Sequence, residues 1–156
     1  MTFTEYLKSI NACSDAVEWA ANKTVEEVVA TCHRGDWLLW LAYKCDIGLQ
    51  PLTLAKGHCA NTVRHLMIDD RSLKAVDTAI AFGEGRATRE ELDAAYAAAY
   101  ASARAAAYAA AAADAYYDAD AAAAIENRLQ TADICRKYIG DLIIQKVNSI
   151  TKPLNQ

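Results

Sequence analysis

The sequence predicts an all-α fold, a single-domain bundle of about six to eight helices packed on a long alanine- and tyrosine-rich helix. Three observations predict it. Roughly two-thirds of residues 94–124 are alanine, which has the highest helix propensity of all residues. Neither proline nor glycine occurs in residues 86–139. A Thr followed three residues later by Glu, the signature of a capping box, occurs at Thr2, Thr24 and Thr88.

The first three predicted helices are short. The capping box at Thr2 opens the first, and Asn11 or Ser14 caps the second. The capping box at Thr24 opens the third. Gly35 is expected to end that helix, because glycine commonly follows the last helical residue.

A fourth helix is predicted to begin at Trp37, with Asp36 as its N-cap, and to end near Cys45. Its apolar run, Trp-Leu-Leu-Trp-Leu-Ala, extends round the helix and predicts a buried element. After a loop, a fifth helix is predicted from about Thr53 to Ile68.

Asp69 or Asp70 caps the sixth predicted helix. The Gly-Glu-Gly sequence at 83–85 ends that helix and is the clearest hinge in the chain. The capping box at Thr88 then starts the long alanine-rich helix.

The long helix is expected to break. A continuous helix over 89–138 would be about 75 Å long at 1.5 Å per residue, which is too long for a compact domain of this size. The break is predicted near 117–120, and a final helix carries Ile125 to Val147. We therefore expect one domain over 1–147, followed by a loose tail at 148–156.

Composition excludes several classes of function. A formal net charge of −4 and a pI near 5.3 argue against a nucleic acid polymer as the partner. The five cysteines are odd in number and scattered, which favours reduced thiols in a cytoplasmic protein. No signal peptide or membrane-spanning stretch is recognisable. Self-association into a homo-oligomer is compatible with this sequence.

The first candidate site lies around the start of the fourth helix. His33 and Arg34 precede a predicted helix N-terminus, whose backbone N–H groups attract anions. Trp37 and Trp40 can stack on a ring or form the wall of a pocket. The alternative is purely structural, with the tryptophans in the core and Gly35 in a tight turn.

A second candidate is the locally basic region 32–65, which holds all three histidines and includes Arg64 and His65. Such a region with aromatic walls suits a phosphorylated or acidic small ligand, whereas scattered surface charges are the alternative. His58 and His65 would lie about 10 Å apart along a helix, too far to share one ion. The sequence therefore predicts no metal and no cofactor.

A third candidate is an arginine within a tyrosine stripe. Tyr96, Tyr100 and Tyr108 recur at multiples of four, and Arg104 occupies one of the intervening positions. This spacing places all four on one face of a helix. Arg104 either extends to water or holds an anionic ligand, for which its planar guanidinium is well suited.

Catalysis has little support. The sequence contains no G-x-S-x-G, H-E-x-x-H or Walker-type motif. A hydrolase or transferase that uses Cys and His stays as a minor alternative, because nothing selects one of the five cysteines.

Two stretches carry a resemblance to a known family. They are Ala-Val-Glu-Trp at 16–19 and Cys-His-Arg-Gly-Asp-Trp-Leu-Leu-Trp at 32–40. Two later parts of the chain add to the resemblance: residues 59–71, and the alanine-rich run that leads to Cys-Arg-Lys at 135–137. With these motifs the chain resembles the putative immunity proteins of bacterial polymorphic-toxin systems, which also occur in phage genomes. The resemblance implies an all-helical, non-enzymatic protein that neutralises something, and it carries over no established active site.

Two functional hypotheses follow. In the first, the chain is an immunity-type inhibitor that binds a toxin or defence-effector protein, with an acidic surface at 114–120 as one candidate patch. In the second, it is a phage-type sponge that sequesters an anionic, nucleotide-like immune signalling molecule. The second hypothesis predicts a positive, aromatic-lined pocket between the helix starting at Asp36 and the tyrosine stripe. The candidate ligand-binding residues are His33, Arg34, Trp37, Trp40, Arg64, His65, Tyr96, Tyr100, Arg104 and Tyr108.

Overall fold

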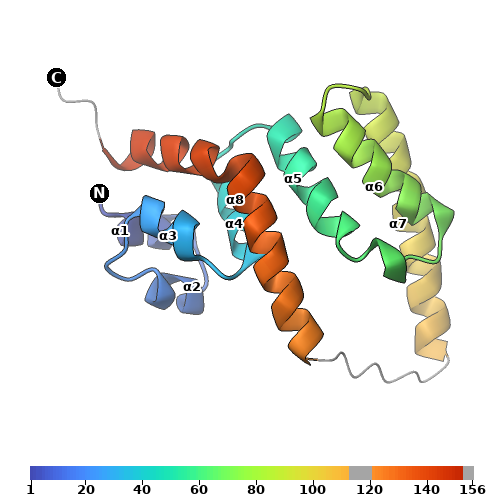
Figure 1. Cartoon of the computed structure of the whole chain (residues 1–156), viewed down its shortest axis with the longest axis horizontal. Helices are drawn as coiled ribbons and strands as arrows, with labels where there is room; N and C mark the ends of the chain where they lie inside the picture. The colour runs from blue at the N-terminus through green and yellow to red at the C-terminus, as the bar shows by residue number, and fades with distance from the viewer. Residues whose placement is uncertain (113–120, 153–156) are drawn as a thin grey trace.

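The computed structural model describes the backbone of residues 1–112 and 121–152 and the side chains of residues 1–100 and 125–152. Every regular element within these ranges is helical, which confirms the all-α prediction (Figure 1). The elements are α1 (Phe3–Ser9), α2 (Ser14–Trp19), α3 (Val25–Thr31), α4 (Gly35–Lys44), α5 (Leu49–Asn61), the 3-10 helix η1 (Arg64–Leu66), α6 (Asp70–Gly83), α7 (Arg89–Ala112) and α8 (Ala121–Thr151).

The predicted capping boxes form. At the start of α1, Thr2 Oγ1 accepts from the N–H of Glu5, and the Glu5 carboxylate accepts from the N–H of Thr2. The same pair of hydrogen bonds joins Thr24 to Glu27 before α3. Thr88 and Glu91 exchange them before α7. Asp69 caps α6 by accepting from the N–H of Arg71.

Gly35 has a different role from the predicted helix stop. It is the first residue of α4, and the residue at the N-cap is Arg34 rather than Asp36. A Cβ added at Gly35 would lie 2.4 Å from Oγ1 and 2.6 Å from the backbone carbonyl carbon of Thr131 in α8. Glycine is therefore needed because the backbones of α4 and α8 approach closely here.

The fifth helix is displaced from its predicted bounds of 53–68. α5 begins at Leu49, with Pro51 in its first turn, where the missing N–H of proline leaves no helical hydrogen bond unmade. It ends at Asn61, and η1 follows as a separate turn.

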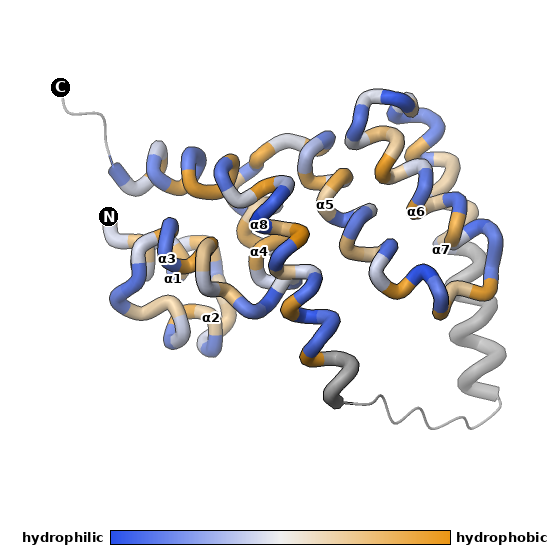
Figure 2. The backbone as a smooth tube through the Cα atoms, in the orientation of Figure 1, coloured by the Kyte–Doolittle hydropathy of each residue, from blue (hydrophilic) through white to orange (hydrophobic). Residues whose placement is uncertain are grey.

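The central helix of the bundle is α8, which packs on α4, α5, α3 and α1 (Figure 1). Its buried hydrophobic side chains recur every three or four residues and are 0–1% exposed. They are Ala132, Cys135, Ile139, Ile143 and Val147. Figure 2 shows hydrophobic positions recurring along α8 between hydrophilic ones.

Here the structure differs from the expected arrangement of a bundle packed on the alanine–tyrosine run. α7, which carries most of the described part of that run, packs mainly on α6 at one side of the molecule. Tyr96 is 42% and Tyr100 67% exposed. Alanine favours a helix but buries little apolar surface, so the isoleucines and valine of α8 gain more by occupying the core.

The long helix is divided as expected into two elements, α7 and α8, which lie apart in space (Figure 1). The predicted break at 117–120 lies outside the described residues, as do the acidic positions of the candidate patch at 114–120. α8 continues through 148–151, beyond the predicted domain boundary at 147. Its Thr151 is buried and donates to the carbonyl of Val147.

In the part of the chain that the structure covers, no helix has the length and hydrophobicity needed to cross a membrane.

Candidate functional site

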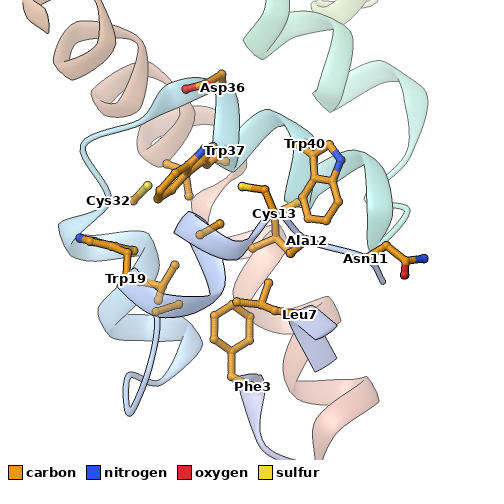
Figure 3. A pocket seen from close by; sticks show the side chains of 15 residues that line it. Phe3, Leu7, Asn11, Ala12, Cys13, Trp19, Cys32, Asp36, Trp37 and Trp40 are labelled. Carbon is orange, nitrogen blue, oxygen red and sulfur yellow. The ribbon is translucent and has the colours of Figure 1, made fainter. Parts of the chain in front are cut away.

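An apolar cleft of about 410 Å³ opens between α1, α2, α3 and the first turns of α4 (Figure 3). We call it the tryptophan cleft, because all three tryptophans of the chain, Trp19, Trp37 and Trp40, line it. The volume falls in the range of ordinary ligand sites, about 300–1,000 Å³. The remaining lining residues are Phe3, Leu7, Asn11, Ala12, Cys13, Ala16, Ala20, Val28, Cys32, Asp36, Leu38 and Leu41.

Two helices present the tryptophans. Trp19 is the last residue of α2, a short helix with no buried residue of its own. Trp37 and Trp40 lie three positions apart on α4 and hence on one side of it. Leu38 and Leu41 of the same helix are buried, so α4 is anchored in the core while its indoles stay partly exposed.

The rings of Trp19, His33 and Trp37 form a cluster at one side of the cleft. Their centroids lie 5.7 Å apart for Trp19 and His33, 6.2 Å for His33 and Trp37, and 6.1 Å for the two indoles. The planes of Trp19 and Trp37 meet at 59°, so the indoles pack against each other and leave no parallel slot between them.

A cation lies over each indole. The Lys23 ammonium is 4.6 Å from the ring centroid of Trp19, and the Lys44 ammonium is 5.6 Å from that of Trp40. The Arg34 guanidinium carbon is 4.8 Å from the centroid of Trp37. These cation–π contacts place one positive charge against each indole, although none of the three cations is among the residues that line the cleft.

Arg34 also forms an ion pair with Asp36, which lines the cleft. Its Nε donates to Asp36 Oδ1 at 2.8 Å and its Nη2 to Asp36 Oδ2 at 2.5 Å. These hydrogen bonds lower the pKa of Asp36 and raise the pKa of Arg34, since they favour the charged form of each. Asp36 therefore lines the cleft as the carboxylate of an ion pair with Arg34.

Of the ten predicted site residues, Trp37 and Trp40 line the cleft. His33 and Arg34 contact the ring of Trp37 without lining the cleft themselves. Arg64 lies in η1 and forms a two-bond ion pair with Asp77 of α6, at 2.5 and 3.0 Å. Its neighbour His65 is exposed. Neither residue lines the tryptophan cleft.

Among the residues whose side chains are described, α4 and the tyrosine stripe do not line a common pocket. α4 packs on α8 and α5, whereas α7 packs on α6, and α5 and α6 lie between α4 and α7 (Figure 1). Tyr96 and Tyr100 are therefore remote from Trp37. The side chains of Arg104 and Tyr108 lie outside those described.

The histidines do not converge. His58 of α5 stacks on Tyr138 of α8 with a centroid distance of 4.5 Å and an interplanar angle of 4°. Among the residues whose side chains are described, no group of three or more His, Cys, Asp or Glu is arranged to hold a metal ion.

Sequence reasoning missed the contribution of α1 and α2 to the cleft. Trp19 belonged to a recognised motif, Ala-Val-Glu-Trp, but nothing local to it indicated that it would face Trp37. The available signal was the presence of tryptophan in both motifs, at 16–19 and 32–40, which could have suggested that the two motifs pack together. Phe3 and Leu7 appear in the sequence only as the apolar side of a short helix.

Comparisons of the chain with protein-family models, with curated proteins and with solved structures find no match.

Proposed function

We propose that this chain is a non-catalytic binding protein of the immunity type, which neutralises a toxin or defence-effector protein by holding it at the tryptophan cleft. The observation that carries the proposal is the gathering of all three tryptophans, each partly exposed, around one apolar hollow. Concave sites lined by apolar and aromatic side chains are typical binding sites. Tryptophan is also among the residues most enriched at the energetic centres of protein interfaces.

The two stretches behind the resemblance to putative immunity proteins support the same site. Ala16 and Trp19 come from the first stretch, and Trp37 and Trp40 from the second. These two stretches are separate in the sequence but both contribute to one cleft, whereas the other parts that carry the resemblance, 59–71 and the alanine-rich run to 135–137, do not line it.

The occupant that suits the cleft is a segment of a partner protein with large apolar side chains and nearby carboxylates. The apolar side chains would displace water from the indole walls, which is favourable in proportion to the area covered. The carboxylates would pair with Lys23 and Lys44, whose ammonium groups lie over the rings of Trp19 and Trp40. Aspartate or glutamate there would gain electrostatic complementarity and faster association.

A nucleotide-like signalling molecule is the second candidate, favoured by the aromatic walls. Two observations rank it lower. A phosphate group would have to compete with the Asp36 carboxylate for Arg34, which already donates two hydrogen bonds to it. A base would also find no parallel gap between Trp19 and Trp37.

The test begins with capture. The tagged chain is recovered from cells that naturally carry it and is weighed by native mass spectrometry, before and after denaturation. We expect a bound protein in the wild type and in the Tyr100→Ala control on α7, but not in Trp37→Ala. Circular dichroism spectra of all three should agree, so that loss of binding is separated from loss of fold.

Neutralisation is tested with the captured protein. Expressed alone it should arrest cell growth, and co-expression with the wild-type chain, but not with Trp37→Ala, should restore growth. A captured protein that leaves growth unchanged would contradict the neutralising role. Release of only a low-mass compound on denaturation would replace this proposal with the sequestering alternative.

A further inference from the structure

Two thiols from distant parts of the sequence meet between α5 and α8. The Sγ atoms of Cys59 and Cys135 lie 3.9 Å apart, and the residues are 76 positions apart in the chain. Both are free thiols. A disulfide has a sulfur–sulfur distance of about 2.05 Å, so a closing movement of roughly 2 Å would join them.

We propose that Cys59 and Cys135 form a redox-modification site, in which a hydroperoxide oxidises Cys59 and Cys135 then closes a disulfide that links α5 to α8. The two thiols have different accessibility, which assigns their order. Cys59 is partly exposed and can meet an oxidant, whereas Cys135 is 0% exposed and reaches only its neighbour. An accessible cysteine beside a resolving cysteine is the usual arrangement of a redox-sensitive pair.

The hydrogen bond between the thiols supports the same order. With both thiols protonated, Cys135 can donate to the carbonyl of Gly35 at 3.5 Å and Cys59 to that of Thr131 at 3.7 Å. When Cys59 is a thiolate, the Cys135 thiol can donate to it instead, and this lowers the pKa of Cys59 against the opposing effect of burial. The contact with Cys59, together with burial, raises the pKa of Cys135. Since the thiolate is the reactive form, Cys59 is the one that attacks the oxidant.

The chemistry balances with one hydroperoxide. The Cys59 thiolate attacks the outer peroxide oxygen, the O–O bond breaks, and the alkoxide or hydroxide leaves and takes up a proton, which gives a sulfenic acid on Cys59. The Cys135 sulfur then attacks the Cys59 sulfur. The S–O bond breaks and hydroxide leaves with the Cys135 proton as water. Two thiols and one hydroperoxide become one disulfide, one alcohol or water, and one further water.

The remaining three cysteines differ in their exposure. Cys45 is buried and donates to the carbonyl of Ala42, and burial raises its pKa to about 11. Cys32 is buried and donates to the carbonyl of Arg34. Cys13 is exposed in the tryptophan cleft, which makes it the matched control for non-specific oxidation.

The test uses the folded wild-type chain with an equimolar amount of hydrogen peroxide. After the reaction the protein is unfolded in guanidinium with N-ethylmaleimide, and its mass is measured. We expect two of the five thiols to resist alkylation. Peptide mapping should join the peptides of Cys59 and Cys135, and dithiothreitol should release them. The oxidised chain should also melt at a higher temperature, because a cross-link restricts the unfolded chain.

Variants make the result specific. Cys59→Ser should leave every remaining thiol alkylated and abolish the oxidation-dependent rise in melting temperature, whereas Cys13→Ser should keep both effects. Cys135→Ser, if it folds, should accumulate a sulfenic acid on Cys59 that dimedone traps. Five alkylated thiols in the treated wild type, or a disulfide between any other pair, would overturn the proposal. The outcome does not depend on what occupies the tryptophan cleft.

Discussion

The indole of Trp19 packs against the indole of Trp37, with ring centroids 6.1 Å apart, and His33 contacts both rings. Trp19 ends α2, whereas His33 and Trp37 flank the start of α4. Because α2 has no buried residue of its own, this ring cluster is a principal attachment of α2 to the rest of the fold.

Trp19→Ala should therefore loosen α2 without unfolding the core. Each aromatic pair is worth about 0.5–1.5 kcal/mol beyond its buried area, so loss of the contacts with His33 and Trp37 should lower the free energy of unfolding by about 1–3 kcal/mol. Urea denaturation measures this. Trp19→Phe, which keeps a ring, should recover part of the loss, and an unchanged midpoint in Trp19→Ala would contradict the role of the cluster.

Arg136 of α8 should prove important for holding α3. Its Nη1 donates to the carbonyls of Val29 and Cys32, at 3.3 and 2.7 Å, and its Nη2 pairs with Asp133. Removal of these charge-assisted hydrogen bonds in Arg136→Ala should cost about 1.5–3 kcal/mol.

The control for Arg136 is Arg128→Ala, an exposed arginine of the same helix, which should stay within about 0.5 kcal/mol of the wild type. Thermal or urea unfolding of the two variants compares them directly. Equal stabilities would mean that the contacts of Arg136 with α3 contribute nothing.

The Arg34–Asp36 pair predicts a small pH dependence of stability. Hydrogen bonds from Arg34 lower the pKa of Asp36 from its ordinary value of 3.8. A carboxyl group with a lowered pKa in the folded state stabilises the fold above its unfolded pKa, and this contribution is lost as the pH falls through the folded pKa.

Asp36→Asn should therefore lower the free energy of unfolding at neutral pH, and the difference from wild type should shrink below pH 3.8. The effect should stay within about 1 kcal/mol, because the Asp36 side chain is 57% exposed and screened by water. Urea titrations across this pH range measure it. Asp141→Asn, at another exposed aspartate, is the control, and a difference that grows as the pH falls would reverse the assignment.

The central position of α8 gives the largest expected loss of stability. Ile143 is 0% exposed, and Ile143→Ala should cost about 2–5 kcal/mol through lost burial and the cavity left behind. Tyr100→Ala in α7, at a side chain that is 67% exposed, should cost much less. Thermal unfolding followed by circular dichroism compares them, and a larger loss in Tyr100→Ala would restore α7 as the organising helix.

The sequence by itself determined the all-α class and the starts of α1, α3, α6 and α7. The signals at Thr2, Thr24 and Thr88 are local, because a capping box needs only residues three positions apart and their own backbone. Any tertiary arrangement that keeps these helices leaves such signals intact. The same locality made Trp37 and Trp40 recognisable as neighbours on one helix.

Only the tertiary structure decided which helices meet. The sequence pattern predicted that Gly35 ends a helix. In the structure, glycine is needed there because a side chain would collide with Thr131, almost a hundred positions away. The alanine–tyrosine run had the strongest helix propensity, yet the core formed on α8. The reason is that the free energy gained on burial depends on apolar surface area and not on helix propensity. Trp19 joined Trp37, and Tyr100 did not, because α5 and α6 pack between α4 and α7.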